Sequence, residues 1–335
     1  MSMNDGEILV SINCITYNHE RFIKQAIESF LMQKTRFDFE VLVHDDASTD
    51  KTIEIIRSYA QKYPKIIKPM YQKENQYSKG KKMFLFNHNR ALGKYVAICE
   101  GDDYWTDPYK LQEQVDYMEK NTECNLVAHA IRIIDNDKPT EKVIAPYSED
   151  RELEFSSVIY DGGIIGTSSI MYRKKAFDNP PDFYFCAPVE DYPLQVYLCE
   201  NKKAFYINKI MSAYRTNIEG SWTDNIYYKG SIEKKIELNK KLICFLEKAN
   251  AFYSYKYDCY IKSAVKKRNF YILRVRNDLK TMRNKEYICM YKDLPFKERF
   301  RIYFNIFFLS YILLLRLLYK RQGIHICFRG RLWKT

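Results

Sequence analysis

The sequence predicts an α/β fold followed by a basic helical extension, and three observations support this prediction. Short apolar runs at residues 9–15 and 39–44 have the length and composition of buried strands. A helical pattern follows the second run over residues 52–63. Beyond about residue 230 the chain changes to basic segments with helical apolar spacing. We therefore expect one large α/β domain and a helical appendage.

Carboxylates follow the apolar strands at two places. The second strand ends in Asp45 and Asp46, and a later apolar strand leads into Asp102 and Asp103. Ligands of open α/β sheets bind beyond the carboxyl ends of the strands, so both pairs are expected at one pocket. Adjacent carboxylates lose hydration and repel each other, which a divalent cation carrying a phosphate group offsets. Asp-Asp pairs and the residues 48–50 also suit helix caps, which is the alternative interpretation.

Four segments match one family in order and spacing. They are VSINCITYN at residues 10–18, AIESFLMQ at 26–33, the acidic segment 40–52, and GKYVAICEGDD at 93–103. On these segments the chain resembles a family-2 glycosyltransferase of the GT-A fold. The resemblance implies an α/β, Rossmann-like, mixed and mostly parallel sheet flanked by helices. It also implies an inverting, non-processive enzyme of the bacterial envelope or capsule type that uses Mg²⁺ or Mn²⁺.

The resemblance assigns residues to the nucleotide part of a nucleoside-diphosphate-sugar donor. Asp46 matches the residue that accepts a hydrogen bond from the base, and Asp45 lies beside it in the sequence. Thr16 and Tyr17 match positions that line the base and the ribose. UDP is the nucleotide that this pattern favours, with GDP and dTDP as alternatives.

The resemblance also assigns residues to the diphosphate and the metal. Asp102 matches the residue that faces the ribose or the sugar, and Asp103 matches the metal ligand. Glu100 stands where many relatives have an aspartate. We expect it to support Asp102 and Asp103 without touching the ligand itself. Relatives often carry Tyr-Arg-x-His after the last strand, whereas this chain has Asn217 at the last position. Arg215 is a predicted phosphate contact, with a surface ion pair as the alternative.

The predicted catalytic base is Asp191, in an acidic pair with Glu190 at the start of an apolar helical pattern. An inverting transfer needs one carboxylate that takes the proton of the acceptor hydroxyl. The pair also suits the positive end of a helix, which is the structural alternative. Gly166 and Thr167 belong to a segment that lies below the sugar in relatives. Trp105 is a candidate for stacking on a sugar, with core packing as its alternative.

Charge divides the chain. Residues 231–335 contain 25 Lys and Arg against 8 Asp and Glu, whereas residues 1–230 contain 29 against 34. We therefore predict a catalytic domain at 1–228 and a basic helical region at 229–335. Nine cysteines without a Cys-x-x-Cys pair suggest reduced thiols, and the first residues do not resemble a signal peptide. Both features favour a cytoplasmic location.

The basic region contains a nearly continuous apolar stretch, and we predict a membrane-interface helix at 300–320. This stretch is short for a membrane span, and basic residues flank it. The expected partner is an anionic membrane surface, at the inner face of the cell membrane. Packing of this helix against the catalytic domain is the alternative.

Together these features predict transfer of one sugar from a nucleoside-diphosphate-sugar, with UDP favoured, to a glycan acceptor in surface polysaccharide synthesis. The basic apolar tail favours a lipid-linked acceptor, with soluble glycans or proteins as the alternatives. One alternative is a nucleotidyltransferase that forms sugar nucleotides, but the glycine-rich phosphate loop of such enzymes has no match near the amino terminus. The other is a nucleic-acid-binding protein that uses the basic region. Its aromatic residues follow apolar helical faces, so we expect no nucleic acid partner.

Overall fold

The computed structural model describes residues 7–135 and 137–305 of the 335-residue chain. The chain divides into two compact units. The first contains residues up to 230 together with 241–265, and the second contains 231–240 and the described residues from 266 onward. The first unit therefore includes residues 241–265, which the sequence prediction assigned to the basic C-terminal region.

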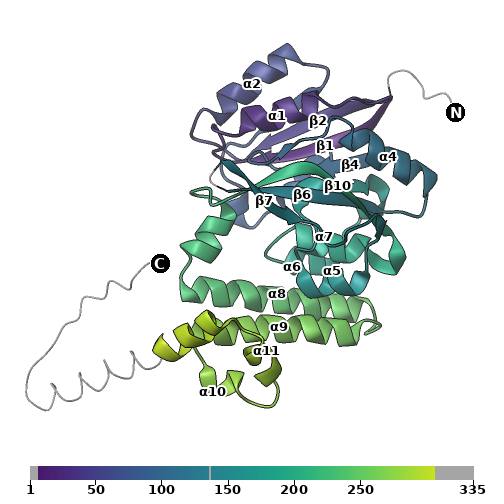
Figure 1. The fold of residues 1–335 in the computed structure, drawn as a ribbon. Helices are drawn as coiled ribbons and strands as arrows, with labels where there is room; N and C mark the ends of the chain where they lie inside the picture. Colours follow the sequence, from purple (N-terminus) through teal and green to yellow (C-terminus); the bar gives the residue numbers. More distant parts are fainter. Residues whose placement is uncertain (1–6, 136, 306–335) are drawn as a thin grey trace, which may run out of the picture. The chain divides into compact units, whose positions relative to one another are not determined.

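The first unit is built around a mixed sheet of ten strands. Figure 1 shows this sheet with helices packed around it. The strand order is β3-β2-β1-β4-β9-β6-β10-β5, with β7 paired to β6 and β8 paired to β10. The strands are β1 (Ile8–Thr16), β2 (Asp38–Asp45), β3 (Ile67–Tyr71), β4 (Tyr95–Ile98), β5 (Tyr104–Trp105), β6 (Leu126–Asp135), β7 (Lys138–Ile144), β8 (Arg151–Glu152), β9 (Met171–Arg173) and β10 (Ala204–Thr216).

Helices connect and cover these strands. The α-helices are α1 (Ile23–Leu31), α2 (Thr52–Lys62), α3 (Met83–His88), α4 (Lys110–Lys120), α5 (Phe155–Asp161), α6 (Asp182–Cys186), α7 (Asp191–Leu198), α8 (Ile232–Phe252), α9 (Asp258–Arg276), α10 (Leu279–Met282) and α11 (Ile288–Lys292). Short 3₁₀ turns are η1 (Tyr77–Lys79), η2 (Thr167–Ser169), η3 (Lys174–Phe177) and η4 (Glu200–Lys202), and η5 (Asp224–Tyr228) is a π-helical turn.

The alternation of side chains along β1 decides which helix covers which face of the sheet. Val10 and Ile12 belong to the hydrophobic core that also contains buried residues of α1. On the opposite face, the Asn13 side chain donates to the carbonyl of Phe84 in α3, and its carbonyl oxygen accepts from the Asn87 amide at 2.9 Å. The central strand is thus covered on both faces, as expected for a mostly parallel sheet.

Most strands of the sheet run in one direction, which determines where the site forms. Strands β1, β2, β3 and β4 are mutually parallel, and β6 is parallel to β10. Strand β9 is antiparallel to both β4 and β6, so β4 and β6 also run the same way. The carboxyl ends of β1, β2, β4, β6 and β10 therefore meet at one edge of the sheet. The predicted mixed, mostly parallel architecture is confirmed.

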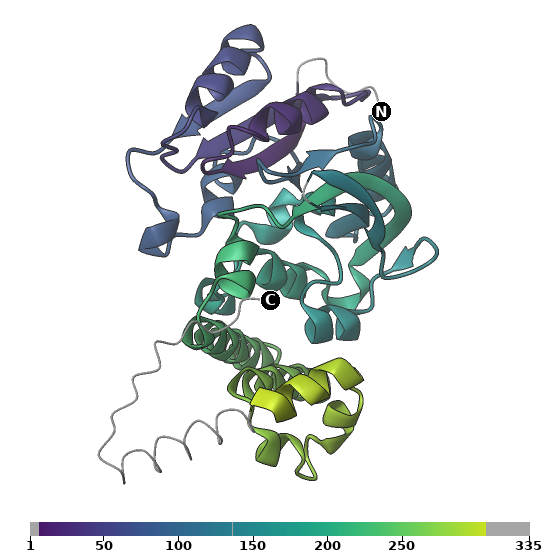
Figure 2. The ribbon, with the colours of Figure 1, turned by 60° about the vertical axis from the view of Figure 1, so that its left-hand side comes forward.

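Residues 241–265 add a helical hairpin to the first unit, formed by the second half of α8 and the first half of α9, which lie side by side in Figures 1 and 2. Phe245 is fully buried, and its ring meets that of Tyr192 in α7 at a centroid distance of 5.0 Å. Phe155 packs edge-on against Tyr253 and Tyr257 of the same hairpin. Aromatic contacts of this kind explain why these residues belong with the α/β unit.

The second unit has a small core of its own around Phe270, Met282 and Tyr287. Residues 296–305 are helical, but most of the predicted interface helix at 300–320 lies outside the described residues. Among the described helices, none is both long enough and apolar enough to span a bilayer. All cysteines of the described residues are free thiols.

Candidate functional site

The acidic residues predicted for the site come from three elements of the first unit. Asp45 is the last residue of β2, the turn with Asp102 and Asp103 follows β4, and Asp191 is the first residue of α7. The parallel directions of β2 and β4 place two of these groups at the same edge of the sheet. The position of α7 decides whether the third group joins them.

The carboxylates after β4 and at the start of α7 lie within electrostatic reach of each other. Burial raises the pKa of Glu100 well above its usual value, and the negative charges of Asp102, Asp191 and Glu190 raise it further. Burial also raises the pKa of Asp103 well above its usual value, with the charge of Asp102 as the next cause. Glu100 thus connects the turn after β4 with the start of α7. Partly buried carboxylates that raise one another's pKa favour binding of a cation.

Asp103 is held in place by the backbone of β10. Its side chain is 2% exposed, and its Oδ1 accepts a hydrogen bond of 2.9 Å from the Arg215 amide. Strand β10 also pairs with β5, directly after the acidic turn. One oxygen of the Asp103 carboxylate is therefore occupied by the backbone, and the orientation of the other is fixed with it.

Glu190 has a structural role that the sequence did not reveal. Its carboxylate accepts hydrogen bonds from the Met83 and Phe84 amides at 2.6 and 3.1 Å, and from the Tyr184 hydroxyl at 2.7 Å. The two amides are at the start of α3, where backbone N–H groups have no partner within the helix. Glu190 therefore caps α3 from a segment more than 100 residues away in the sequence and has little capacity left for a substrate.

Asp191, in contrast, has few partners. Its Oδ1 accepts from the Tyr192 amide at 2.8 Å, and its Oδ2 lies 3.5 Å from the Thr167 hydroxyl. Burial raises its pKa above the usual aspartate value, whereas the Thr167 hydroxyl lowers it. Gly166 precedes Thr167 at a tight position, because a Cβ there would be 2.5 Å from Ile131 Cδ1. The predicted acceptor segment thus lies beside the predicted base.

Asp45 and Asp46 both make hydrogen bonds to the backbone. Asp45 accepts from the amide and hydroxyl of Ser48 at 3.0 and 2.5 Å, which closes the turn after β2. Asp46 accepts from the amides of Gln76 and Tyr77 at 2.7 and 3.0 Å. Asp46 therefore holds the loop after β3, and a hydrogen bond to a nucleotide base would use the lone pairs that these amides leave.

Tyr77 is a site residue that sequence reasoning missed. Burial raises the pKa of its hydroxyl, a hydrogen bond with Trp222 lowers it, and the charges of Glu190 and Glu100 raise it. The loop that Asp46 holds therefore carries an aromatic side chain whose hydroxyl pKa is affected by the charges of Glu190 and Glu100. Tyr77 lies in a short 3₁₀ turn far from the recognised motifs, and the sequence around it contains no signal of this role.

Thr16 and Tyr17 lie at the carboxyl end of β1, as the resemblance implied. The Thr16 side chain is 3% exposed, yet its hydroxyl has no hydrogen-bond partner. Tyr17 is 44% exposed, so its ring is accessible for stacking. Asn18 ties this loop to the one after β2, because its side-chain oxygen accepts from the Thr49 amide at 2.8 Å. The position of both predicted donor residues is thus compatible with their expected role.

The structure does not support the expected stacking of Trp105 on a sugar. Its side chain is 1% exposed, and the indole N–H donates to the Ser168 carbonyl at 3.0 Å. Its ring packs edge-on against Phe30 at 4.8 Å, and the Lys110 ammonium lies 3.9 Å from the ring centroid. Lys110 is itself fully buried, and burial lowers its pKa to about 7. With both faces covered, Trp105 cannot stack on a sugar, and core packing is the correct interpretation.

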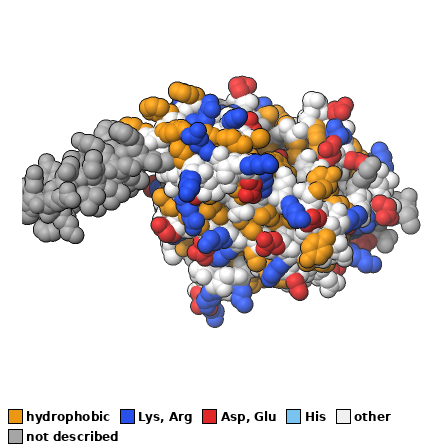
Figure 3. Space-filling model, turned by 90° about the horizontal axis from the view of Figure 1, so that it is seen from below, with side chains coloured by type: hydrophobic (Ala, Val, Ile, Leu, Met, Phe, Trp, Pro, Cys, Tyr) orange, Lys and Arg blue, Asp and Glu red, His pale blue; other side chains and the backbone are white. Residues whose placement is uncertain are grey.

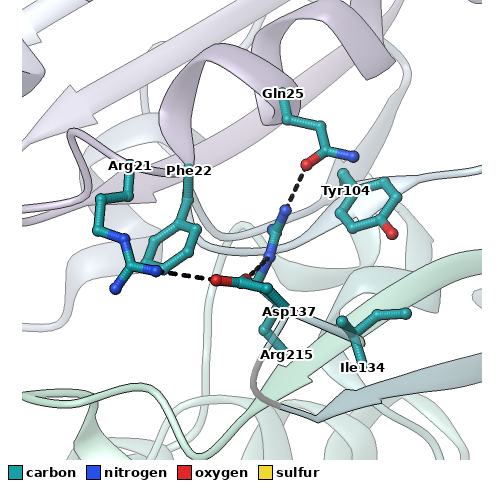
Figure 4. A pocket seen from close by; sticks show the side chains of 7 residues that line it. All are labelled: Arg21, Phe22, Gln25, Tyr104, Ile134, Asp137 and Arg215. Atoms are coloured by element: carbon teal, nitrogen blue, oxygen red, sulfur yellow. Dashed lines mark hydrogen bonds and ion pairs between the residues drawn. The ribbon is translucent and has the colours of Figure 1, made fainter. Parts of the chain in front are cut away.

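Arg215 lies in a pocket of about 270 Å³ at the edge of the sheet (Figure 4). Its guanidinium donates to the Asp102 carbonyl and to the Gln25 side chain. The group also lies 4.6 Å from the Tyr104 ring centroid and 3.5 Å from an oxygen of Asp137. Its side chain is therefore fixed against the backbone of the acidic turn. The predicted phosphate contact would need donors that these partners leave free.

Asn217 does not reach the acidic residues with its side chain, which donates to Asp135 at 2.6 Å. It adopts a left-handed backbone conformation, with φ of 58°, in the turn after β10. Across the described residues, no three His, Cys, Asp or Glu side chains are grouped closely enough to hold a metal ion alone. A cation at Asp103 would accordingly need oxygen atoms from a ligand such as a diphosphate.

Comparison with known proteins identifies the family. The family model described as "Glycosyl transferase family 2" matches residues 11–179. The chain belongs to this family. An uncharacterised protein of Mycobacterium tuberculosis is 34% identical over 216 residues, which cover 64% of this chain and 60% of the relative. The chain thus spans about 60% of the length of this relative.

A second relative has a defined activity in its name. It is the UDP-Glc:alpha-D-GlcNAc-diphosphoundecaprenol beta-1,3-glucosyltransferase WfgD of Escherichia coli. The two are 29% identical over 215 residues, which cover 62% of this chain and 78% of WfgD.

Two solved structures share the fold. Residues 1–349 of Staphylococcus aureus TarS in complex with UDP-GlcNAc superpose with a TM-score of 0.58 at 18% identity, covering 88% of this chain and 79% of TarS. The mannosyltransferase PcManGT from Pyrobaculum calidifontis, in complex with GDP-Man and Mn²⁺, gives a TM-score of 0.54 at 14% identity, covering 92% and 80%. These likenesses confirm the predicted GT-A architecture.

Proposed function

We propose that the protein is an inverting, metal-dependent glycosyltransferase that moves one sugar from a nucleoside-diphosphate-sugar to a glycan acceptor. The observation that carries this proposal is a partly buried acidic cluster, in which Asp103 is enclosed and Glu100 is influenced by the charges of both Asp102 and Asp191. Membership of the glycosyltransferase family supports the reaction class.

The donor binds at the carboxyl edge of the sheet in this proposal. Tyr17 and Tyr77 offer aromatic surface to the nucleotide, and the unpartnered hydroxyl of Thr16 offers a hydrogen bond. Asp46 keeps the Tyr77 loop in position and accepts from the base. UDP is the proposed nucleotide, because WfgD uses UDP-Glc and TarS was solved with UDP-GlcNAc.

Asp103, with Asp102 beside it, is proposed to hold Mg²⁺ or Mn²⁺ together with the donor diphosphate. A buried carboxylate with a raised pKa suits this role, because a divalent cation offsets the charge that burial disfavours. The cation supplies charge stabilisation for the leaving diphosphate. The backbone amide of Arg215 keeps the Asp103 carboxylate in a fixed orientation for binding.

Asp191 is the proposed base, which takes the proton of the acceptor hydroxyl as the oxygen attacks the anomeric carbon. Its Oδ2 makes only one long contact, to Thr167, so this oxygen is available to an acceptor. The raised pKa makes the carboxylate a stronger base than an ordinary aspartate. Glu190 supports the site indirectly, because it caps α3 and thereby positions the start of α7.

The acceptor is proposed to be a lipid-linked glycan at the inner face of the cell membrane, in surface polysaccharide synthesis. The name of WfgD supports an acceptor on diphosphoundecaprenol. Exposed aromatic residues in the second unit support contact with a membrane: Phe296, Phe300 and Phe304 are 74, 60 and 55% exposed. Figure 3 shows hydrophobic side chains interspersed with Lys and Arg on the face that it displays.

Replacement of the base tests the proposed reaction. UDP release from UDP-Glc is measured with GlcNAc-diphosphoundecaprenol as acceptor and Mn²⁺ present, and donor binding is measured by thermal shift. Asp191→Asn should lower transfer by roughly 10²–10⁴-fold and leave the donor-induced shift intact. Asp182→Asn is the matched control, because Asp182 is exposed at the start of α6.

The donor and acceptor panels define the specificity. Other UDP-sugars, GDP-Man and dTDP-sugars replace UDP-Glc if it gives no shift, and free oligosaccharides replace the lipid-linked acceptor. Full activity of Asp191→Asn with any active pair would remove Asp191 from the base role. Absence of a thermal shift with every nucleoside-diphosphate-sugar would contradict the proposed function as a whole.

A further inference from the structure

His19 lies at the same edge of the sheet as the acidic turn, in the loop between β1 and α1. Its Nε2 is 3.8 Å from Asp102 Oδ2, and both side chains are 20% exposed. Its Nδ1 is buried and has no hydrogen-bond partner. Nδ1 faces the backbone of the acidic turn, so the ring nitrogen that can reach a ligand is Nε2, beside Asp102.

The backbone around His19 is firmly held. The His19 amide donates to the Thr52 hydroxyl at 2.8 Å, and its carbonyl accepts from the Phe22 and Ile23 amides at 2.9 and 2.8 Å. These bonds connect the loop to the starts of α2 and α1. The imidazole is therefore placed against the acidic turn by the fold and not by a flexible loop.

The ring packs closely on the turn itself. A Cβ at Gly101 would be 3.1 Å from His19 Nδ1 and 2.6 Å from the Thr16 hydroxyl, so only glycine leaves this space. Thr16 is 97% buried in this cradle, and its hydroxyl is also unpartnered. Two unsatisfied polar atoms thus face the backbone that carries Asp102.

The other described histidines are fully enclosed in the unit. His88 is 1% exposed, and its ring nitrogens contact the Tyr172 hydroxyl and Asp178. His44 and His129 are also buried, at 0 and 1% exposure, beside Gln72 and the Ala130 carbonyl. Among the histidines of residues 7–135 and 137–305, His19 alone combines solvent access with a carboxylate of the acidic turn.

The distance between His19 and Asp102 suits a shared cation. Two ligand atoms that each lie about 2.2 Å from one ion are roughly 3.1 Å apart at a right angle and roughly 4.4 Å apart when opposite. The observed 3.8 Å is too long for a hydrogen bond, and an approach of roughly 0.7 Å would bring the two atoms to the right-angle separation. Imidazole nitrogen and carboxylate oxygen are both suitable ligands for Mn²⁺.

We propose that His19 is a ligand of the divalent cation that carries the donor diphosphate, with Asp102 facing the same ion. This inference rests on the proposed function. Many relatives carry a histidine at the position of Asn217, whose side chain here is hydrogen-bonded to Asp135. In this chain His19 would provide the imidazole instead. The ligand class is a divalent metal with a nucleoside diphosphate.

The test measures the metal and not the reaction. Mn²⁺ affinity in the presence of UDP is measured on the full chain from the electron paramagnetic resonance signal of free Mn²⁺. His19→Phe keeps the ring that packs on Gly101 and Phe22 but removes both nitrogens. We expect at least a tenfold loss of Mn²⁺ affinity, and loss of the nitrogen coupling in the spin-echo spectrum of the bound ion.

Two controls keep the outcome interpretable. Lys24→Ala, at an exposed position of α1, should leave Mn²⁺ affinity unchanged. His19→Ala serves as a second variant if the phenylalanine disturbs folding, which thermal unfolding without ligand reports. Wild-type nitrogen coupling and affinity in both His19 variants would overturn the inference alone. Failure of the wild type to bind Mn²⁺ with UDP, GDP or dTDP would overturn the inference together with the proposed function.

Discussion

The two carboxylates at the start of α7 differ in their hydrogen bonds, and this difference supports the proposed chemical role of Asp191 over one for Glu190. Glu190 accepts hydrogen bonds from two amides and a hydroxyl. Asp191 accepts a hydrogen bond from one amide and makes one long contact to the Thr167 hydroxyl. A carboxylate with an available oxygen and a raised pKa suits proton transfer. Neighbouring residues of the same charge can thus be distinguished by their partners.

Thr167 should tune the pH dependence of transfer. A general base works when deprotonated, so activity is present above the raised pKa of Asp191 and is lost as the pH falls through it. The Thr167 hydroxyl lowers this pKa, so Thr167→Val should raise it further. The acid limb of the kcat/KM profile should then move to higher pH, by roughly a few tenths of a unit. An acid limb that is unchanged, or that moves to lower pH, would show that the Thr167 hydroxyl does not lower the pKa of the catalytic base.

The sequence indicated candidate site residues but not their contacts. Asp103 and Asp191 are candidates because they occur in motifs at element ends. The two amides that donate to Glu190 lie more than 100 residues away, and no local pattern indicates such a contact. Trp105 was ambiguous, because an aromatic residue after a strand suits both a sugar platform and a core, and only the packing of Phe30 and Lys110 decides.

At the scale of elements, periodicity located the strands and helices within a few residues. The predicted strands at 9–15 and 39–44 correspond to β1 and β2, and the helix at 52–63 corresponds to α2. Strand β9 has only three residues and joins β4 to β6, a pairing that the short apolar pattern at its position does not reveal. So short a strand exists because its neighbours provide hydrogen-bond partners, and its own pattern carries little information.

Helix α3 should depend on Glu190 for stability. The Lys82 side chain does not cap this helix, so the Glu190 carboxylate is the acceptor for its first amides. Glu190→Gln loses the charge and one acceptor oxygen, and should lower the free energy of unfolding by roughly 1–3 kcal/mol. Chemical denaturation measures this change, with Asp182→Asn as the control. An unchanged denaturation midpoint would show that the capping bonds contribute little.

At the scale of the whole molecule, the change in charge near residue 230 does not coincide with the change in packing. Residues 241–265 follow the charge boundary, yet they belong to the first unit through contacts of Phe245, Tyr253 and Tyr257. The charged residues that define the charge boundary lie on the exposed face of a helix, whereas the unit to which the helix belongs is decided by the residues on its buried face. The predicted boundary between 1–228 and 229–335 therefore does not coincide with the boundary between the two compact units. It remains a prediction of where the catalytic part of the chain ends.

The second unit should bind anionic membranes through its exposed aromatic row. Phe296, Phe300 and Phe304 stack at 6.4 Å between successive rings, and Lys297 and Arg301 are exposed among them. Replacing the three phenylalanines by serine should reduce sedimentation with anionic vesicles by about tenfold or more, because apolar burial is lost. The full-length chain is compared with Leu92→Ser, an exposed apolar position of the first unit. Equal sedimentation of all variants would contradict this assignment.

The acidic cluster around Asp103 is proposed to bind a metal ion together with a nucleoside diphosphate. Anomalous scattering from Mn²⁺ in crystals of the full chain grown with UDP locates the ion directly. The account predicts one strong peak roughly 2.2 Å from a carboxylate oxygen of Asp103, in contact with the diphosphate and on the same side as Asp191. A Mn²⁺–UDP complex bound at another surface, with the Asp103 carboxylate unliganded, would contradict it.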